Sequence, residues 1–150
     1  MPSLVSVRTL VLILLSANVA LAADPQSPDW HHDARQAWAA ARTEHRPLLL
    51  YFTTEGCVYC RKMQHETLED AIVADTIRET FVAAQLHAKE NRSLVRSLRI
   101  RVYPTTVILS PDSGVIDYIP GYVAAEPLLA RLRSAAPRET TAENGSTHTR

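Results

Sequence analysis

Residues 47–60 read PLLLYFTTEGCVYC, and this stretch decides the fold. The five consecutive apolar residues at 48–52 are typical of a β-strand that is buried on both faces. Polar residues at 53–56 indicate a loop, and residues 61–67 contain no glycine or proline that would break a helix. The stretch therefore predicts a strand, a turn and a helix, with Cys57 and Cys60 at the turn.

The position of the cysteine pair predicts its chemistry. Cys57 would lie at the N-terminus of the helix, where free backbone N–H groups and the helix dipole favour an anion. A thiolate is stabilised there, so its pKa falls, and the thiolate is the reactive form of cysteine. Cys60 follows about one turn later and can attack a mixed disulfide formed by Cys57. We therefore predict that Cys57 is the nucleophile and Cys60 the resolving thiol.

A C-x-x-C pair is also compatible with an inert disulfide or with half of a metal site. An inert bridge would close a loop so short that it constrains the unfolded chain little. A metal site would need further ligands, and the candidates that we consider are the histidines His31, His32, His65 and His87. The strand–turn–helix context favours redox chemistry over both alternatives, and we predict no metal site.

The rest of the chain alternates helical and strand patterns. We expect a helix from Trp30 to Pro47 with Asp33 near its start, and another that Asp70 caps. The further predicted elements are a strand at 81–86, a helix at 91–98, strands at 105–109 and 115–119 joined by a turn, and a final helix around residues 128–136. Strands that alternate with helices and close with a hairpin indicate an α/β fold with a mixed central sheet and helices on both faces.

Composition narrows the function classes. The 150 residues suggest one domain, and 16 Lys and Arg balance 16 Asp and Glu, which argues against a nucleic-acid partner. The chain has 2 cysteines, too few for a multi-bridge scaffold or a four-cysteine zinc site.

The N-terminus has the layout of a secretory signal peptide. A basic residue precedes an apolar run, and small residues end in a cleavage motif before Ala23, so we assign residues 1–22 as the signal. An uncleaved membrane anchor is the alternative, but the strongly apolar run is shorter than the roughly 20 residues that a span needs. We therefore expect a periplasmic or secreted protein, with a lead-in at 23–29 and a disordered tail at 137–150.

Several motifs in this order resemble the thioredoxin-fold superfamily. They are residues 47–52, the cysteine pair, Arg61-Lys62-Met63 and Tyr103-Pro104-Thr105. The chain is most similar to secreted bacterial thioredoxin-like domains and to the C-terminal domain of the membrane electron-transfer reductase. The resemblance covers residues 30–136 and implies a three-layer α/β/α sandwich.

The resemblance also implies a substrate-binding surface. In this family a cis-proline loop faces the cysteines, and the matching residue is Pro104; the alternative is an ordinary trans proline at the start of an edge strand. Tyr103 would offer its backbone to an extended substrate peptide. We expect Val58 and Tyr59, between the cysteines, to contact substrate as well.

The sequence departs from thioredoxins at three places. Tyr51 stands where they have a buried aspartate, so the proton route during reduction must differ. Gly56 stands where they have a tryptophan. The dipeptide between the cysteines is Val58-Tyr59 and lacks the histidine that stabilises the thiolate in strongly oxidising relatives, which favours a more reducing potential.

These observations together predict a thiol–disulfide oxidoreductase that acts on protein disulfides through Cys57 and Cys60. A reductase or isomerase role is favoured over an oxidase role. The protein would need no bound cofactor, would receive electrons from a membrane donor and would be a monomer. The competing class is a binding module on the same fold, either a metal carrier or a redox-inert chaperone.

Overall fold

The computed structural model describes residues 27–137. The predicted signal peptide, the first residues of the predicted lead-in and all of the predicted tail except Pro137 lie outside the described residues. The elements follow one another in the order β1 (Trp30–His31), α1 (Ala34–Glu44), β2 (Leu48–Thr53), α2 (Val58–Met63), the π-helix η1 (Gln64–Leu68), α3 (Ala71–Thr80), β3 (Val82–His87), α4 (Arg92–Ser97), β4 (Thr105–Ser110), β5 (Gly114–Pro120) and α5 (Ala125–Ala135).

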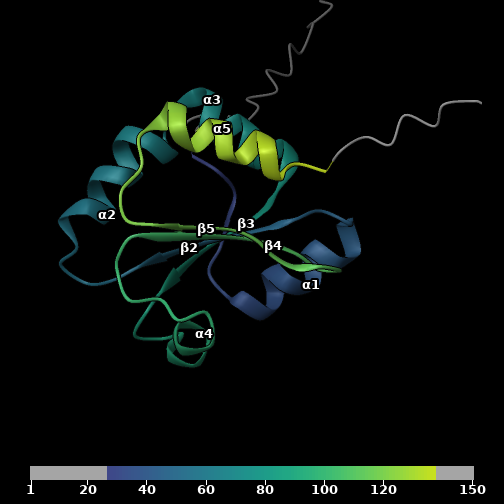
Figure 1. Cartoon of the computed structure of the whole chain (residues 1–150), viewed down its shortest axis with the longest axis horizontal. Coiled ribbons are helices and arrows are strands. Elements are labelled where there is room, and N and C mark those ends of the chain that lie inside the picture. Colours follow the sequence, from purple (N-terminus) through teal and green to yellow (C-terminus); the bar gives the residue numbers. More distant parts are fainter. Residues whose placement is uncertain (1–26, 138–150) are drawn as a thin grey trace, which may run out of the picture.

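A five-stranded mixed sheet lies at the centre, with the strand order β1-β3-β2-β4-β5. The strands β1, β3 and β2 run parallel, whereas β4 runs antiparallel to both of its neighbours. Figure 1 shows α3 and α5 on one side of the sheet and α1 and α4 on the other. The predicted three-layer α/β/α sandwich with a mixed sheet is confirmed.

Side-chain alternation along β2 divides the core into two clusters. Leu49 and Tyr51 point into the layer of α3 and α5, which also contains Met63 and Leu68. Leu48, Leu50 and Phe52 point into the layer of α1 and α4. The strand is buried on both faces, as its continuous apolar run predicts.

The start of the first helix differs from the prediction. Trp30 lies in β1 and pairs with Ala83, and α1 begins only at Ala34. The Asp33 carboxylate accepts hydrogen bonds from the backbone N–H groups of Arg35 and Gln36, so the chain is extended up to this cap. Trp30 packs in the α3–α5 layer, on the opposite face of the sheet from α1, and therefore cannot belong to that helix.

The helix after the cysteines also differs. The helix predicted at 61–67 begins earlier, at Val58, and continues beyond Met63 as a π-helix to Leu68. Asp70 then caps α3 as predicted, because its carboxylate accepts from the N–H groups of Ile72 and Val73. The remaining strands and helices lie within two or three residues of their predicted bounds.

Candidate active site

Cys57 and Cys60 form a disulfide at the junction of β2 and α2, with their Cα atoms 5.2 Å apart. The loop between strand and helix includes Gly56, whose φ of 70° lies in the left-handed region that favours glycine. This turn delivers Cys57 to the N-cap position of α2, and Cys60 lies in the first turn of that helix. The strand–turn–helix placement predicted for the pair is therefore confirmed.

The two sulfur atoms have different surroundings. Cys60 is 5% exposed, whereas Cys57 is partly exposed. The backbone N–H of Cys60 donates a hydrogen bond to Sγ of Cys57 at 3.0 Å. A donor aimed at this sulfur stabilises a negative charge there once the disulfide is reduced. The accessible sulfur is thus also the one that the helix start favours as a thiolate.

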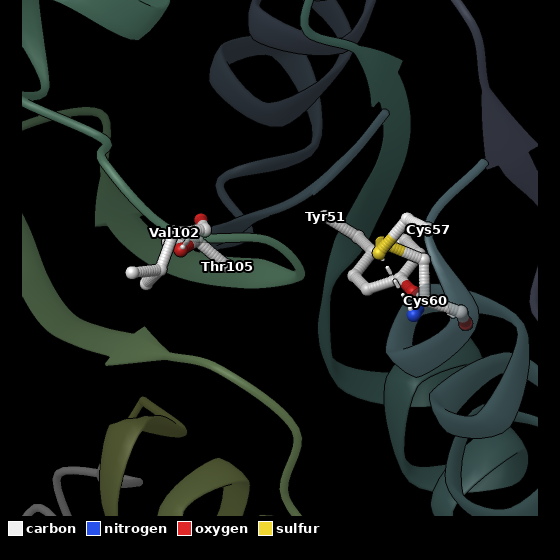
Figure 2. Close-up of a disulfide and its surroundings, with 5 residues drawn as sticks. All are labelled: Tyr51, Cys57, Cys60, Val102 and Thr105. Atoms are coloured by element: carbon white, nitrogen blue, oxygen red, sulfur yellow. Dashed lines mark hydrogen bonds between the residues drawn. A yellow bond between two sulfur atoms is a disulfide. The ribbon is translucent and has the colours of Figure 1, made fainter. Parts of the chain in front are cut away.

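Tyr51 lies directly beside the cysteine pair (Figure 2). Its side chain is 1% exposed, and its hydroxyl donates a hydrogen bond to the backbone carbonyl of Cys60 at 3.0 Å. Burial raises the pKa of this phenol well above its ordinary value, so the group is neutral. The sequence marks Tyr51 only as a departure from the family pattern. Its position in the strand could identify it. Tyr51 lies two residues after Leu49 in β2, so both side chains lie on the same face of the sheet, which is the face that α2 covers.

The loop before β4 comes to the same end of the sheet as the cysteines. Thr105 pairs with Phe52 near the end of β2, so residues 101–104 lie next to the strand end that leads to Cys57. The peptide bond between Tyr103 and Pro104 is cis, and Pro104 is buried. The Thr105 hydroxyl donates to the carbonyl of Val102 at 2.8 Å and fixes the loop. Figure 2 shows Val102 and Thr105 across from the disulfide.

Exposed apolar side chains surround the disulfide. Val58 is 64% exposed and Tyr59 is 61% exposed, although both lie in the first turn of α2. Val102, on the facing loop, is 47% exposed. We call Val58, Tyr59 and Val102 the apolar rim of the site. No local pattern in the sequence points to Val102, because only the pairing of β2 with β4 brings its loop to the cysteines.

Tyr59 also contacts Tyr122 on the β5–α5 loop, which in turn contacts Lys62 of α2 and Glu66 of η1. Its ring centroid lies 6.5 Å from that of Tyr122. The ammonium group of Lys62 stands 4.6 Å from the centre of the Tyr122 ring, and the Tyr122 hydroxyl donates to the Glu66 carboxylate at 3.0 Å. These contacts connect α2 and η1 to the β5–α5 loop beside the site.

A polar cavity of about 350 Å³ adjoins both cysteines. It is lined by Tyr51, Thr53, Thr54, Gly56, Cys57, Cys60, Arg61, Gln64, His65 and Gln85. No carboxylate of the described residues belongs to this lining. A larger cavity of about 590 Å³ lies between α1 and α4, but it does not include the cysteines and we assign it no part in their chemistry.

The candidate metal ligands come from β1 and the residue after it, from η1 and from β3. His65 faces the Glu69 carboxylate, with Nδ1 and Oε2 2.9 Å apart, and His31 lies in β1. Within residues 27–137, no three His, Cys, Asp or Glu side chains come together in an arrangement that could hold a metal ion. The same stretch of chain contains no helix that is long and apolar enough to cross a membrane.

Comparison with known proteins agrees with this geometry. The chain is similar to a thioredoxin from Thermus thermophilus, with 27% sequence identity, a TM-score of 0.69, and coverage of 82% of this chain and 98% of that protein. It is also similar to the oxidised C-terminal domain of DsbD from Neisseria meningitidis, with 17% identity, a TM-score of 0.60, and coverage of 71% and 98% respectively. The second likeness shows the fold alone.

A family model identifies the family of this chain. No curated protein sequence matches the chain. A family model described as a thioredoxin-like domain matches residues 34–136, which is most of the chain and includes both cysteines and the loop before β4. The resemblance seen in the sequence is thus confirmed, and the chain belongs to the thioredoxin-like domain family.

Proposed function

We propose that this protein catalyses thiol–disulfide exchange on protein substrates, with Cys57 as the nucleophile and Cys60 as the resolving thiol. One observation carries the proposal: the more accessible sulfur of the pair accepts the N–H of Cys60 at the start of α2. A purely structural bridge has no need for this asymmetry. The short loop that it closes adds little stability, since the chain-entropy gain grows with loop length.

The reaction on a substrate disulfide has two steps. The Cys57 thiolate attacks one substrate sulfur, a mixed disulfide forms, and the other substrate sulfur leaves as a thiolate that takes up a proton. Cys60 then loses its proton and attacks Sγ of Cys57, which releases the second substrate thiol. The substrate disulfide gains two electrons, and the cysteine pair loses two as it forms the Cys57–Cys60 disulfide.

The substrate would lie against the apolar rim and the loop at Tyr103 and Pro104. The rim offers exposed apolar surface to the side chains around a substrate cysteine, and such surface on a protein marks an interaction site. The backbone of Tyr103 would pair with an extended peptide segment. A protein or peptide disulfide fits this surface better than a small disulfide does, because a small disulfide cannot reach both sides of it.

We further propose that electrons flow from this protein to its substrates, as in a reductase or isomerase. The Val58-Tyr59 dipeptide contains no histidine that would stabilise an extreme thiolate, and a less stabilised reduced form has a lower reduction potential. The N-terminal pattern favours a periplasmic or secreted protein, and we propose that a membrane donor keeps it reduced. Such a donor is needed because an extracytoplasmic compartment is oxidising.

Equilibration with glutathione buffers tests the activity. We expect the purified protein to move between dithiol and disulfide as the glutathione ratio changes, and to accelerate the reduction of a protein disulfide by dithiothreitol. The Cys57→Ser variant should do neither. The midpoint should lie far below the value of about −120 mV that is typical of strong oxidants.

Two results would contradict the proposal. A folded protein whose cysteine pair never exchanges with glutathione would be a redox-inert binding module. A protein that retains stoichiometric copper or zinc and loses it to a chelator would be a metal carrier. A midpoint near that of strong oxidants would reverse only the direction of electron flow.

A further inference from the structure

Within residues 27–137, Tyr51 is the one buried polar side chain that contacts Cys60 through a hydrogen bond. Its ring packs in the α3–α5 layer, 6.0 Å from the ring of Trp30, and its hydroxyl reaches the carbonyl of Cys60. Burial in this layer leaves the ring little freedom, so β2 and its core neighbours fix the position of the hydroxyl. The hydrogen bond therefore ties the first turn of α2 to β2.

The carbonyl that Tyr51 contacts has a second partner. The backbone N–H of Gln64 also points at the Cys60 carbonyl, at the point where α2 passes into the π-helix η1. A carbonyl oxygen can accept two hydrogen bonds, so Tyr51 adds a restraint that the helix does not supply. This restraint acts on Cys60, whose Sγ must reach Sγ of Cys57.

Tyr51 is poorly suited to take a proton from Cys60. Its hydroxyl hydrogen is directed at the Cys60 carbonyl, and burial raises its pKa, so the group stays neutral at working pH. The cavity is faced by Cys57 at the N-cap of α2, by Cys60 and Arg61 of α2, by His65 of η1 and by the uncharged Gln85 of β3. Besides Tyr51 itself, the described lining thus offers the thiols and two basic side chains, and no carboxyl group.

The cavity offers the proton a route to solvent. Its lining is polar, and a polar cavity of this size admits water. Water in the cavity can accept the proton that Cys60 loses.

We propose that Tyr51 is a positioning residue for the resolving step: its neutral hydroxyl holds Cys60 in place for attack on Cys57, and the Cys60 proton leaves through the polar cavity. The proposal rests on the exchange activity proposed above. In the balanced step, the Cys60 thiol and the Cys57–substrate mixed disulfide become the Cys57–Cys60 disulfide and a substrate thiol. Tyr51 neither gains nor loses a proton in it.

The Tyr51→Phe variant tests this, because it removes the hydroxyl and keeps the ring in the core. In a glutathione buffer, acid quenching and mass spectrometry give the ratio of Cys57–glutathione mixed disulfide to Cys57–Cys60 disulfide. A neutral hydrogen bond is worth roughly 0.5–1.5 kcal/mol, so we expect this ratio to rise about two- to tenfold. The Tyr118→Phe variant is the matched control, since Tyr118 lies in β5 and packs on the opposite face of the sheet. Its ratio should equal that of the unmodified protein.

The first step is isolated in a Cys60→Ser background. There, Cys57 should react with a small aromatic disulfide at the same rate with and without Tyr51→Phe. In the full pair, Tyr51→Phe should leave the shape of the pH profile of the resolving step unchanged. The positioning role would be overturned if Tyr51→Phe left the mixed-disulfide ratio unchanged. It would also be overturned if the variant slowed attack by Cys57 and resolution by Cys60 equally. Loss of an ionisation from the pH profile would make Tyr51 a proton acceptor instead.

The controls separate this proposal from the one on which it rests. If the unmodified protein forms no disulfide with glutathione at any ratio, the exchange activity itself is wrong and the role of Tyr51 falls with it. If the unmodified protein exchanges normally and Tyr51→Phe matches Tyr118→Phe, only the positioning role is wrong.

Discussion

The backbone N–H of Cys60 points at Sγ of Cys57 across 3.0 Å, so the proposed resolving residue also stabilises the thiolate of the proposed nucleophile. The relationship follows from the N-cap position of Cys57, which turns its side chain back toward the N–H three residues later. Serine, threonine and aspartate use the same geometry with an oxygen. Here a sulfur occupies the cap, and its charged form gains most from the donor.

The first prediction is that the Cys57 thiol of the reduced protein titrates below the value of about 8.5 typical of free cysteine. The N–H of Cys60 and the start of α2 favour the thiolate over the thiol. Thiolate absorbance at 240 nm, followed against pH in the Cys60→Ser variant, measures the pKa directly. The Cys57→Ser variant is the control, and a low pKa that persisted there would assign the thiolate to Cys60.

The second prediction separates the roles of the two cysteines. Cys60→Ser should leave a Cys57 that attacks but cannot be released, so mixed disulfides with partner proteins should accumulate and disappear on reduction. Cys57→Ser should trap none, because Cys60 is 5% exposed and cannot reach a protein disulfide. Gel electrophoresis without reductant distinguishes the two variants. Mixed disulfides that accumulated only in Cys57→Ser would make Cys60 the nucleophile and Cys57 the resolving thiol.

The sequence predicts most of the elements because their causes are local. The continuous apolar run identifies β2, and the side chains of Asp33 and Asp70 cap the helices that follow them. Each of these signals depends on neighbours within four residues. The cysteine pair belongs to this class too, since strand, turn and helix are contiguous.

Other features depend on contacts between distant segments. Trp30 matches the spacing of the helix that follows it, but pairing of β1 with β3 places it on the other face of the sheet. The hydrogen bond from Tyr51 to Cys60 requires that α2 cross the face that Tyr51 lines. The spacing of residues along the chain does not determine which face a helix crosses.

The loop at Tyr103 and Pro104 illustrates the same limit. These residues lie more than forty positions from Cys57, and only a resemblance to known proteins suggests that they face it. In the structure, antiparallel pairing of β2 with β4 brings Thr105 opposite Phe52 and the loop to the end of the sheet where the cysteines are. Long-range strand order, which no local pattern encodes, places this part of the site.

The third prediction concerns the apolar rim. Val102→Ser should weaken the exchange with a protein disulfide severalfold through a higher KM, because it removes exposed apolar surface that a substrate would cover. The rate with a small aromatic disulfide should stay the same, since such a substrate needs only the sulfur of Cys57. Steady-state kinetics with the two substrates gives both numbers.

Val115→Ser is the matched control for Val102→Ser. Val115 is 53% exposed, close to the 47% of Val102, but it pairs with Leu109 at the opposite end of β4. Removing its side chain should change neither rate. Equal losses in the two variants would mean that the effect comes from general stability or solubility and that the rim does not contact substrate.

The last prediction is a pH dependence of stability that arises far from the cysteines. Asp117 of β5 forms an ion pair with Arg131 of α5, whose Nε donates to the carboxylate at 2.7 Å and whose second nitrogen contacts the other oxygen. The hydrogen bond from Arg131 holds the pKa of Asp117 below its ordinary value, although partial burial opposes this effect. The pair connects the edge strand of the sheet to the last helix.

The sign of the effect follows from that lowered pKa. The carboxyl group of Asp117 is more acidic in the folded than in the unfolded protein. The ion pair therefore stabilises the fold fully above the unfolded pKa of about 3.9, and this stabilisation is lost as the pH falls through the lower folded pKa. Since Arg131 is 42% exposed, we expect about 1 kcal/mol or less at neutral pH. Urea unfolding of Asp117→Asn should therefore show a deficit at pH 7 that shrinks toward zero near pH 2. The control is Asp112→Asn, in the exposed β4–β5 turn, which should show no such deficit at either pH. A deficit in Asp117→Asn that did not change with pH would mean that lost packing, rather than the charge of the carboxylate, causes the loss of stability.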